Sequence, residues 1–238
     1  MKELHSWNVS YARARQLQSE LACKVEFTRL KKNPKLIAGL DCAFSRDGKR
    51  IFAAVVVLRR SNFELVETVS ASRKVTFPYI PGLLTFREAP VCIAAVKKLR
   101  SQPDVFIVDG QGVAHPRRLG LAAHLGLFLD QPTIGCAKSR LTGTYDEPSS
   151  EKGAYSWLKE EKSTSNVQSV VIGAVVRTRM NVKPLFVSVG NKCRLKDAIR
   201  VVLDCAVKYR LPEPSRLAHQ AVSKLSRGGP VCLPGATI

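Results

Sequence analysis

Short apolar runs bounded by turn residues mark the first third of the chain and indicate β-strands. Three such runs cover residues 36–44 (LIAGLDCAF), 51–58 (IFAAVVVL) and 63–69, where charged and apolar positions partly alternate. Only residues 45–50 separate the first run from the second. A turn this short joins antiparallel neighbours, because parallel strands need a crossover of about a dozen residues or more. The pattern therefore predicts a three-stranded antiparallel meander.

Segments with a helical period of apolar residues alternate with further strand-like runs along the rest of the chain. This order predicts an α/β fold, with parallel strands beside the meander and helices flanking a mixed sheet. The N-terminal helix is predicted within residues 6–24, its buried face formed by Ala12, Leu17, Leu21 and Ala22. The other predicted elements are strands at 105–108, 132–137, 167–176 and 185–189, helices at 86–99, 119–129 and 195–209, a last helix carrying Leu217, His219 and Val222, and a surface loop at 142–152.

The run at residues 105–108 (VFIV) is typical of a strand buried on both faces, and it ends in a carboxylate, Asp109. Ligands of open α/β sheets bind beyond the carboxyl ends of the strands, so Asp109 is placed for chemistry. The alternative is that Asp109 and Gly110 only begin a turn.

Two further acids interrupt apolar segments. Asp41 lies inside the first strand of the meander, where an unpaired charge is costly and is rarely placed for packing. Glu88 lies at the start of the helix predicted at 86–99, where Thr85-x-x-Glu88 matches a capping box, and capping is the structural alternative for this residue.

Composition points to one domain and a polyanionic partner. The chain has 238 residues, 45% of them hydrophobic, and we expect a single domain at residues 1–227 followed by a disordered tail at 228–238. No membrane span or signal peptide is expected, and seven scattered cysteines without a C-x-x-C pair favour the cytoplasm. The net charge of +19 favours nucleic acid over a membrane surface.

The order of the predicted elements is that of a ribonuclease H-like fold. In that order the first meander strand and the strand at 105–108 are neighbours, so Asp41 and Asp109 face each other and Glu88 reaches in from the intervening helix. Three converging carboxylates repel one another, and Mg²⁺ relieves such repulsion. Lys138, at the end of the strand predicted at 132–137, could neutralise charge on a phosphate; the alternative is an ordinary solvated lysine.

Several segments resemble the motifs of the endonuclease V family of deoxyinosine 3′-endonucleases. They read, in chain order, LIAGLDCAF, FPYIPGLLTFRE, FIVDGQGVAHPRRLGLAAHLG, PTIGCAKSRL and YRLPEPSRLAH, and they extend from residue 36 to 219. The resemblance implies a ribonuclease H-like fold and Mg²⁺- or Mn²⁺-dependent cleavage. It also implies cleavage of the second phosphodiester 3′ to an inosine lesion, leaving a 3′-hydroxyl and a 5′-phosphate.

The resemblance assigns the chemistry to five residues. Asp41, Glu88 and Asp109 match the metal-binding acids of the family, and Lys138 matches its active-site lysine. His219 matches a position near the metal that is histidine in some relatives and aspartate in others.

Recognition is assigned to other segments. Tyr79 matches the wedge that enters the duplex beside the lesion, and the flanking Pro78, Ile80 and Pro81 stiffen its loop. The pocket for a flipped hypoxanthine matches Gly82, Leu84, Gly110, Gly112, His115 and Leu121. A base must leave the stack to be inspected, at a cost of a few kcal/mol.

Other functions fit the sequence less well. Gly110-Gln111-Gly112 follows a strand, but His115 stands where a dinucleotide-binding fingerprint needs glycine, and no G-x-S-x-G elbow of a serine hydrolase is present. A non-catalytic nucleic-acid-binding module would explain the charge but not the acids. An inosine-specific ribonuclease stays open, because the residues do not decide between DNA and RNA. We expect a monomer that binds damaged DNA.

Overall fold

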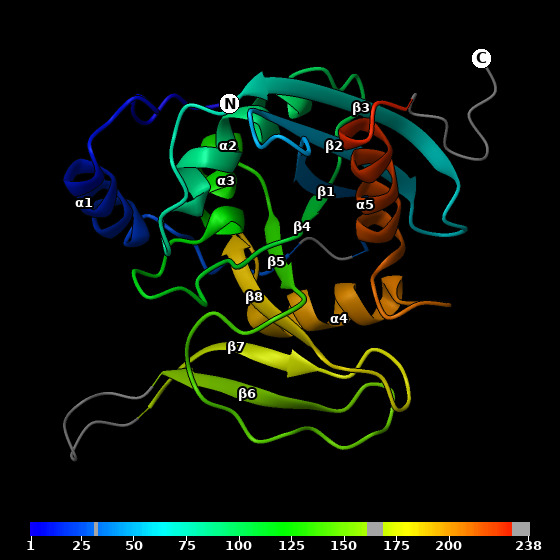
Figure 1. Ribbon diagram of the computed structural model, residues 1–238. Helices are drawn as coiled ribbons and strands as arrows, with labels where there is room; N and C mark the ends of the chain where they lie inside the picture. Colours follow the sequence, from blue (N-terminus) through cyan, green and yellow to red (C-terminus); the bar gives the residue numbers. More distant parts are fainter. Residues whose placement is uncertain (31–32, 161–168, 230–238) are drawn as a thin grey trace.

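The meander predicted from the first three runs is present in the structure, a computed structural model that describes residues 1–30, 33–160 and 169–229. In these residues eight strands form one sheet in the order β3-β2-β1-β4-β5-β8-β7-β6 (Figure 1). Their bounds are β1 Leu36–Phe44, β2 Arg50–Arg59, β3 Leu65–Lys74, β4 Val105–Val108, β5 Thr133–Ala137, β6 Tyr155–Glu160, β7 Val170–Val176 and β8 Leu185–Asn191. Strand β4 is parallel to β1 and β5, and the other pairs are antiparallel. The sheet is therefore mixed and ribonuclease H-like, as predicted.

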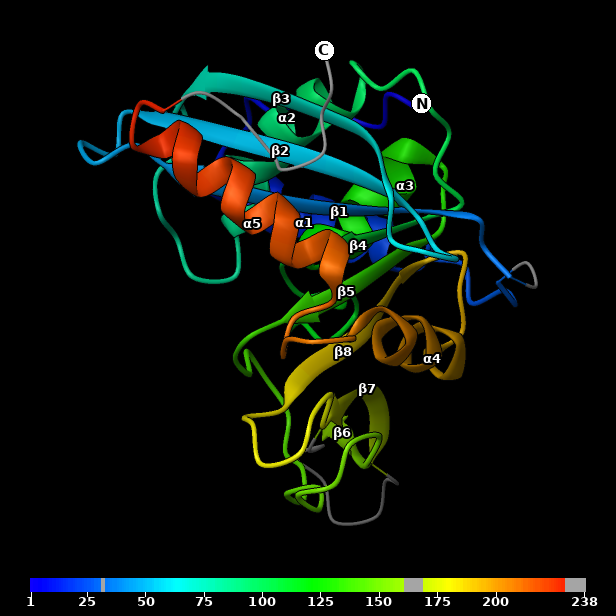
Figure 2. The ribbon, with the colours of Figure 1, turned by 90° about the vertical axis from the view of Figure 1, so that its right-hand side faces the viewer.

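Helices cover both faces of the sheet (Figure 2). The helices are α1 Tyr11–Ala22, α2 Leu84–Val96, α3 Leu121–Leu129, α4 Leu195–Cys205 and α5 Glu213–Ser226. The alternation of side chains along β2 explains the two layers, because successive residues of a strand point to opposite faces. Val55 packs in the cluster that contains α2, whereas Ala54 and Val56 pack against Ala218 and Val222 of α5.

Close packing of α5 on β1 depends on Gly39. A Cβ at this position would lie 2.1 Å from the main-chain carbon and oxygen of Pro214, so only glycine lets the helix lie this close. From Ser215, one turn of helix to His219 rises about 6 Å, and two strand residues from Gly39 to Asp41 advance about 6.6 Å. The two elements therefore carry His219 and Asp41 to the same place.

Two predictions about helices are wrong in detail. Thr85 does not cap α2, because the helix begins at Leu84, Leu83 occupies the N-cap position without a side-chain hydrogen bond, and Thr85 is buried inside the first turn. The buried face of α1 is formed by Ala14, Leu17, Gln18 and Leu21, and Ala12 is exposed. The pattern of apolar residues misplaced this face because one of its buried positions is occupied by a polar residue, Gln18.

The strands differ from the predictions mainly at the far edge of the sheet. The sequence predicted no strand at β6, because only Leu158 of its residues is buried and its alternation is weak. Strand β3 extends beyond residue 69 to Lys74, and α4 ends at Cys205 rather than at 209. Residues 167–168 of one predicted strand and 230–238 of the predicted tail lie outside the described part of the chain. In that part no helix is long and apolar enough to cross a membrane.

Candidate active site

Asp41 and Asp109 meet just beyond the last pair between β1 and β4, because these two interior strands are parallel neighbours. Leu40 pairs with Val108, and the amide of Asp109 donates a hydrogen bond to the carbonyl oxygen of Leu40 over 2.9 Å. Each aspartate follows directly on one member of this pair. Asp41 is 6% exposed, so its carboxylate is largely removed from water. The order of elements predicted that these two strands are neighbours, and their parallel pairing confirms it.

His219 reaches the two aspartates from α5, the helix that packs on β1 and β2. Its Nδ1 lies 2.7 Å from Oδ2 of Asp41, and this hydrogen bond raises the pKa of the imidazole. One ligand atom from each of Asp41, Asp109 and His219 lies within 4.8 Å of the others. These three side chains form the group in the described residues that could hold a metal ion.

Glu88 lies in the first half of α2 and is 8% exposed. Burial, then the negative charge of Asp41, raises the pKa of Glu88 to about 8, and Asp109 adds to the effect. Glu88 is not a member of the group defined by the 4.8 Å distance, so its assignment as a metal ligand stays a prediction. It is electrostatically coupled to both aspartates.

Lys138 follows β5 directly, and its Nζ is hydrogen-bonded to Oδ2 of Asp109. Burial and the charge of Asp41 raise the pKa of Asp109, whereas Lys138 acts in the opposite direction. The ammonium of Lys138 thus contacts one carboxyl group, that of Asp109, and the acidic charge of the site is only partly balanced. Carboxylate oxygens with unbalanced charge, beside an imidazole, fit a hard divalent cation.

A cavity of about 440 Å³ opens beside the acids. Its walls include most of the residues predicted for chemistry and base recognition: Asp41, Glu88, Asp109, Lys138, Tyr79, Ile80, Pro81, Gly82, Leu84, Gly110, His115 and Leu121. Pro78, Gly112 and His219 are not part of this wall. Gly112 instead packs on β8, where a Cβ would lie 2.0 Å from the carbonyl oxygen of Val189. Tyr79 is 68% exposed, as a wedge that enters a duplex must be.

The inner wall of the cavity is braced by hydrogen bonds to Gly82. Its carbonyl oxygen accepts from Nε2 of Gln18 at 3.0 Å and from Nη2 of Arg117 at 2.7 Å, and Nε2 of His115 lies 3.1 Å away. The amide of Arg117 donates to Nδ1 of His115 over 3.1 Å. His115 is therefore neutral with the proton on Nε2, and burial lowers its pKa to about 4.

Gln18 and Arg117 were not predicted from the sequence. Gln18 is fully buried, and its Oε1 accepts a hydrogen bond from Nε of Arg117 over 2.6 Å. The available signal was a glutamine at helical spacing within an apolar face, since Ala14, Leu17, Gln18 and Leu21 follow an i, i+3, i+4, i+7 pattern. A buried polar side chain at such a position needs partners.

The fold and the site together define a nuclease of the ribonuclease H-like class, with Asp41 on β1, Asp109 and Lys138 directly after β4 and β5, and Glu88 and His219 on α2 and α5. A family model described as Endonuclease V matches residues 19–220. The Endonuclease V of Dehalococcoides mccartyi is 48% identical over 225 residues, which cover 94% of this chain and 98% of that protein. The chain belongs to the endonuclease V family.

Solved structures agree with this assignment. The Endonuclease V of Streptomyces avermitilis superposes with a TM-score of 0.85 at 36% identity, and the match covers 94% of this chain and 96% of that one. The Endonuclease V of Ciona intestinalis, in complex with a 24mer DNA containing an inosine followed by a ribo-adenosine, gives a TM-score of 0.74 at 28% identity. That match covers 91% of this chain and 98% of the other.

Proposed function

We propose that the protein is an Mg²⁺-dependent endonuclease that recognises inosine and hydrolyses the second phosphodiester bond on its 3′ side, leaving a 3′-hydroxyl and a 5′-phosphate. The observation that carries the proposal is the convergence of Asp41, Asp109 and His219 beside a cavity large enough for a base. The inosine-containing DNA bound by the Ciona relative supports the choice of substrate. Mn²⁺ is expected to substitute for Mg²⁺.

The base is recognised in the cavity between the loop that carries Tyr79 and the segment after β4. A flipped hypoxanthine would enter beside Gly82 and His115, while Tyr79 fills the space it leaves in the stack. The neutral His115 uses both ring nitrogens for main-chain contacts, so it fixes the wall of the cavity. Arg117 and Gln18 hold that wall from behind.

The acidic cluster, which consists of Asp41, Glu88 and Asp109, is the part of the site that carries out cleavage. Asp41, Asp109 and His219 would hold the cation, with Glu88 adding negative charge beside them. When bound, Mg²⁺ supplies electrostatic stabilisation of the charge that builds up on the phosphate during in-line displacement. Asp41 orients the imidazole of His219 through Nδ1. Lys138, on the wall of the same cavity, can bind a phosphate oxygen and place the scissile bond.

We infer a role in the repair of deaminated DNA, in the cytoplasm, by a monomer whose catalytic domain spans residues 1–227. The ribonucleotide in the DNA of the Ciona complex favours inosine-containing RNA as a second candidate substrate.

The test is a cleavage assay on matched duplexes with and without one deoxyinosine. We expect one nick in the inosine strand in Mg²⁺, no nick in EDTA, and ends that a ligase and a polymerase accept as 5′-phosphate and 3′-hydroxyl. Asp41→Ala and Asp109→Ala should lower the single-turnover rate by about 100-fold or more while the proteins stay folded. Near-normal turnover in both variants would contradict the proposal.

The same assay on inosine-containing RNA decides between the two substrates. A nuclease specific for RNA would cut only that strand. A binding module would bind both substrates and cut neither in any divalent cation.

A further inference from the structure

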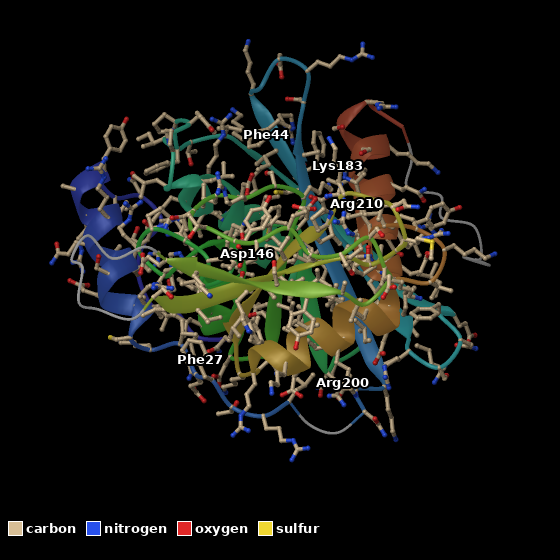
Figure 3. The ribbon with its side chains drawn as sticks, turned by 90° about the horizontal axis from the view of Figure 1, so that it is seen from below. Phe27, Phe44, Asp146, Lys183, Arg200 and Arg210 are labelled. Carbon is tan, nitrogen blue, oxygen red and sulfur yellow. The ribbon has the colours of Figure 1, made fainter. Side chains whose placement is uncertain are left out.

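Arg210 links three segments of the chain through main-chain carbonyls. It lies in the connection between α4 and α5, close to Lys183 (Figure 3). Its Nε donates to the carbonyl oxygen of Lys183 over 2.7 Å. Its Nη2 donates to the carbonyl oxygens of Pro184 at 2.8 Å and Lys138 at 3.1 Å. One guanidinium thus joins the end of β5 to the start of β8.

The sheet leaves the main chain of Lys138 without support at this point. Ala137 with Phe186 is the last pair between β5 and β8, so Lys138 lies one position beyond the ladder, and Pro184, which would oppose Ser139 in this register, has no amide hydrogen to extend it further. Beyond the end of the ladder, the planar guanidinium of Arg210 holds the main chain instead, because its donors can bind several carbonyl oxygens at once. The carbonyl oxygen of Arg210 itself accepts from Oγ1 of Thr178 over 2.7 Å, which holds the arginine in turn.

The position of the Lys138 ammonium depends on this support. A lysine has a flexible four-carbon stem, so the reach of its Nζ is set by where its main chain is held. Lys138 lies one residue beyond the strand, its side chain is 37% exposed, and its Nζ contacts Asp109. A shift of about 1 Å at a catalytic group can lower a rate by about 100-fold.

We propose that Arg210 is a positioning residue that holds the main chain of Lys138 so that its ammonium meets the scissile phosphate. The inference rests on the proposed function, in which Lys138 acts on that phosphate. Arg210 acts through Lys138 and touches neither substrate nor metal.

Arg177 supplies a matched control. It is a buried arginine whose guanidinium also donates to main-chain carbonyls, those of Ser149 at 3.0 Å and Pro148 at 2.8 Å, together with that of Val182. No hydrogen bond in the described residues joins Arg177 to Lys138. Arg177→Lys and Arg210→Lys both keep the positive charge and lose the fork, so they separate loss of structure from loss of positioning.

The experiment measures single-turnover cleavage and binding of an inosine duplex, together with the melting temperature. Arg210→Lys is expected to slow cleavage by about 10- to 100-fold with binding within about twofold of wild type. Arg177→Lys should lower the melting temperature and leave the rate within about threefold. Arg210→Gln serves as a second variant with the fork removed and the charge lost.

A double-mutant cycle with Lys138→Ala completes the test. In the Lys138→Ala background, Arg210→Lys should slow cleavage by no more than about twofold further, because the group it positions is already gone. An equal loss in both backgrounds would overturn the inference and leave the proposed function intact. A normal rate for Lys138→Ala alone would overturn the role of Lys138 in the proposed function, and the inference with it.

Discussion

Replacing His115 by glutamine should flatten the acid side of the stability profile. The imidazole is 3% exposed and its pKa is about 4 in the folded protein, against 6.5 when the chain is unfolded. The unfolded chain therefore binds more protons between these values, so stability rises with pH. This contribution is fully present above pH 6.5 and is lost as the pH falls towards 4.

The two pKa values set the size of the effect. Moving from pH 8 to pH 5 should cost about 2 kcal/mol of unfolding free energy at this one residue. Glutamine does not titrate, and its amide N–H can replace Nε2–H at the carbonyl oxygen of Gly82. The variant should therefore lose about 2 kcal/mol less than wild type over the same interval.

Urea unfolding at pH 8, 7, 6 and 5, followed by fluorescence, measures the effect. His5 and His124, whose pKa values burial also lowers, are present in both proteins, so their contributions cancel in the difference. Parallel loss of stability in the two proteins would mean that His115 is not held neutral, and the proton assignment at the cavity wall would be refuted.

Three further predictions concern binding. Tyr79→Ala removes a stacking surface and leaves the acidic cluster in place, so affinity for an inosine duplex should fall by about 5- to 100-fold in a titration. The preference for this duplex over an undamaged one should fall as well, and an unchanged preference would mean that Tyr79 is not the wedge. Because the chain carries a net charge of +19, the logarithm of its affinity for duplex DNA should fall with the logarithm of the salt concentration, with a slope of about −0.9 per phosphate contacted. An affinity that does not change with salt would exclude the basic surface as the binding face. Binding of Mg²⁺ at pH 7 should release close to one proton more from wild type than from Glu88→Gln, because the pKa of Glu88 is about 8 without the metal and a cation lowers it. Calorimetry in buffers of different ionisation enthalpy measures this difference, to which His219, present in both proteins, does not contribute.

The sequence predicted the parts of the site that follow from local pattern. Strands β1 and β4 begin and end where their apolar runs do, and the carboxylates that break or follow those runs are the two that meet. Asp41 and Asp109 could be found because a carboxylate within or directly after an apolar run is costly to bury and contributes little to packing.

The main-chain partners of the supporting residues could not be predicted in the same way. Gln18 and Arg210 donate to main-chain carbonyls, at Gly82 and Lys138, and a carbonyl has the same chemistry whatever its residue type. The sequence therefore carries no mark of such a partner. The failed cap at Thr85 has a related cause, since Pro81-Gly82, with a φ of +76° at the glycine, turns the chain into the helix two residues too early for the box.

The lack of a side chain at Gly39 also bears on the order in which the parts of the site form during folding. It admits α5, and α5 supplies a histidine to an aspartate 178 positions away along the chain. Contacts between such remote segments carry a large loop-closure cost and form late. A refolding chain can thus have a complete meander and paired strands β1 and β4 while the acids still lack their imidazole. We expect recovered cleavage to report the docking of α5.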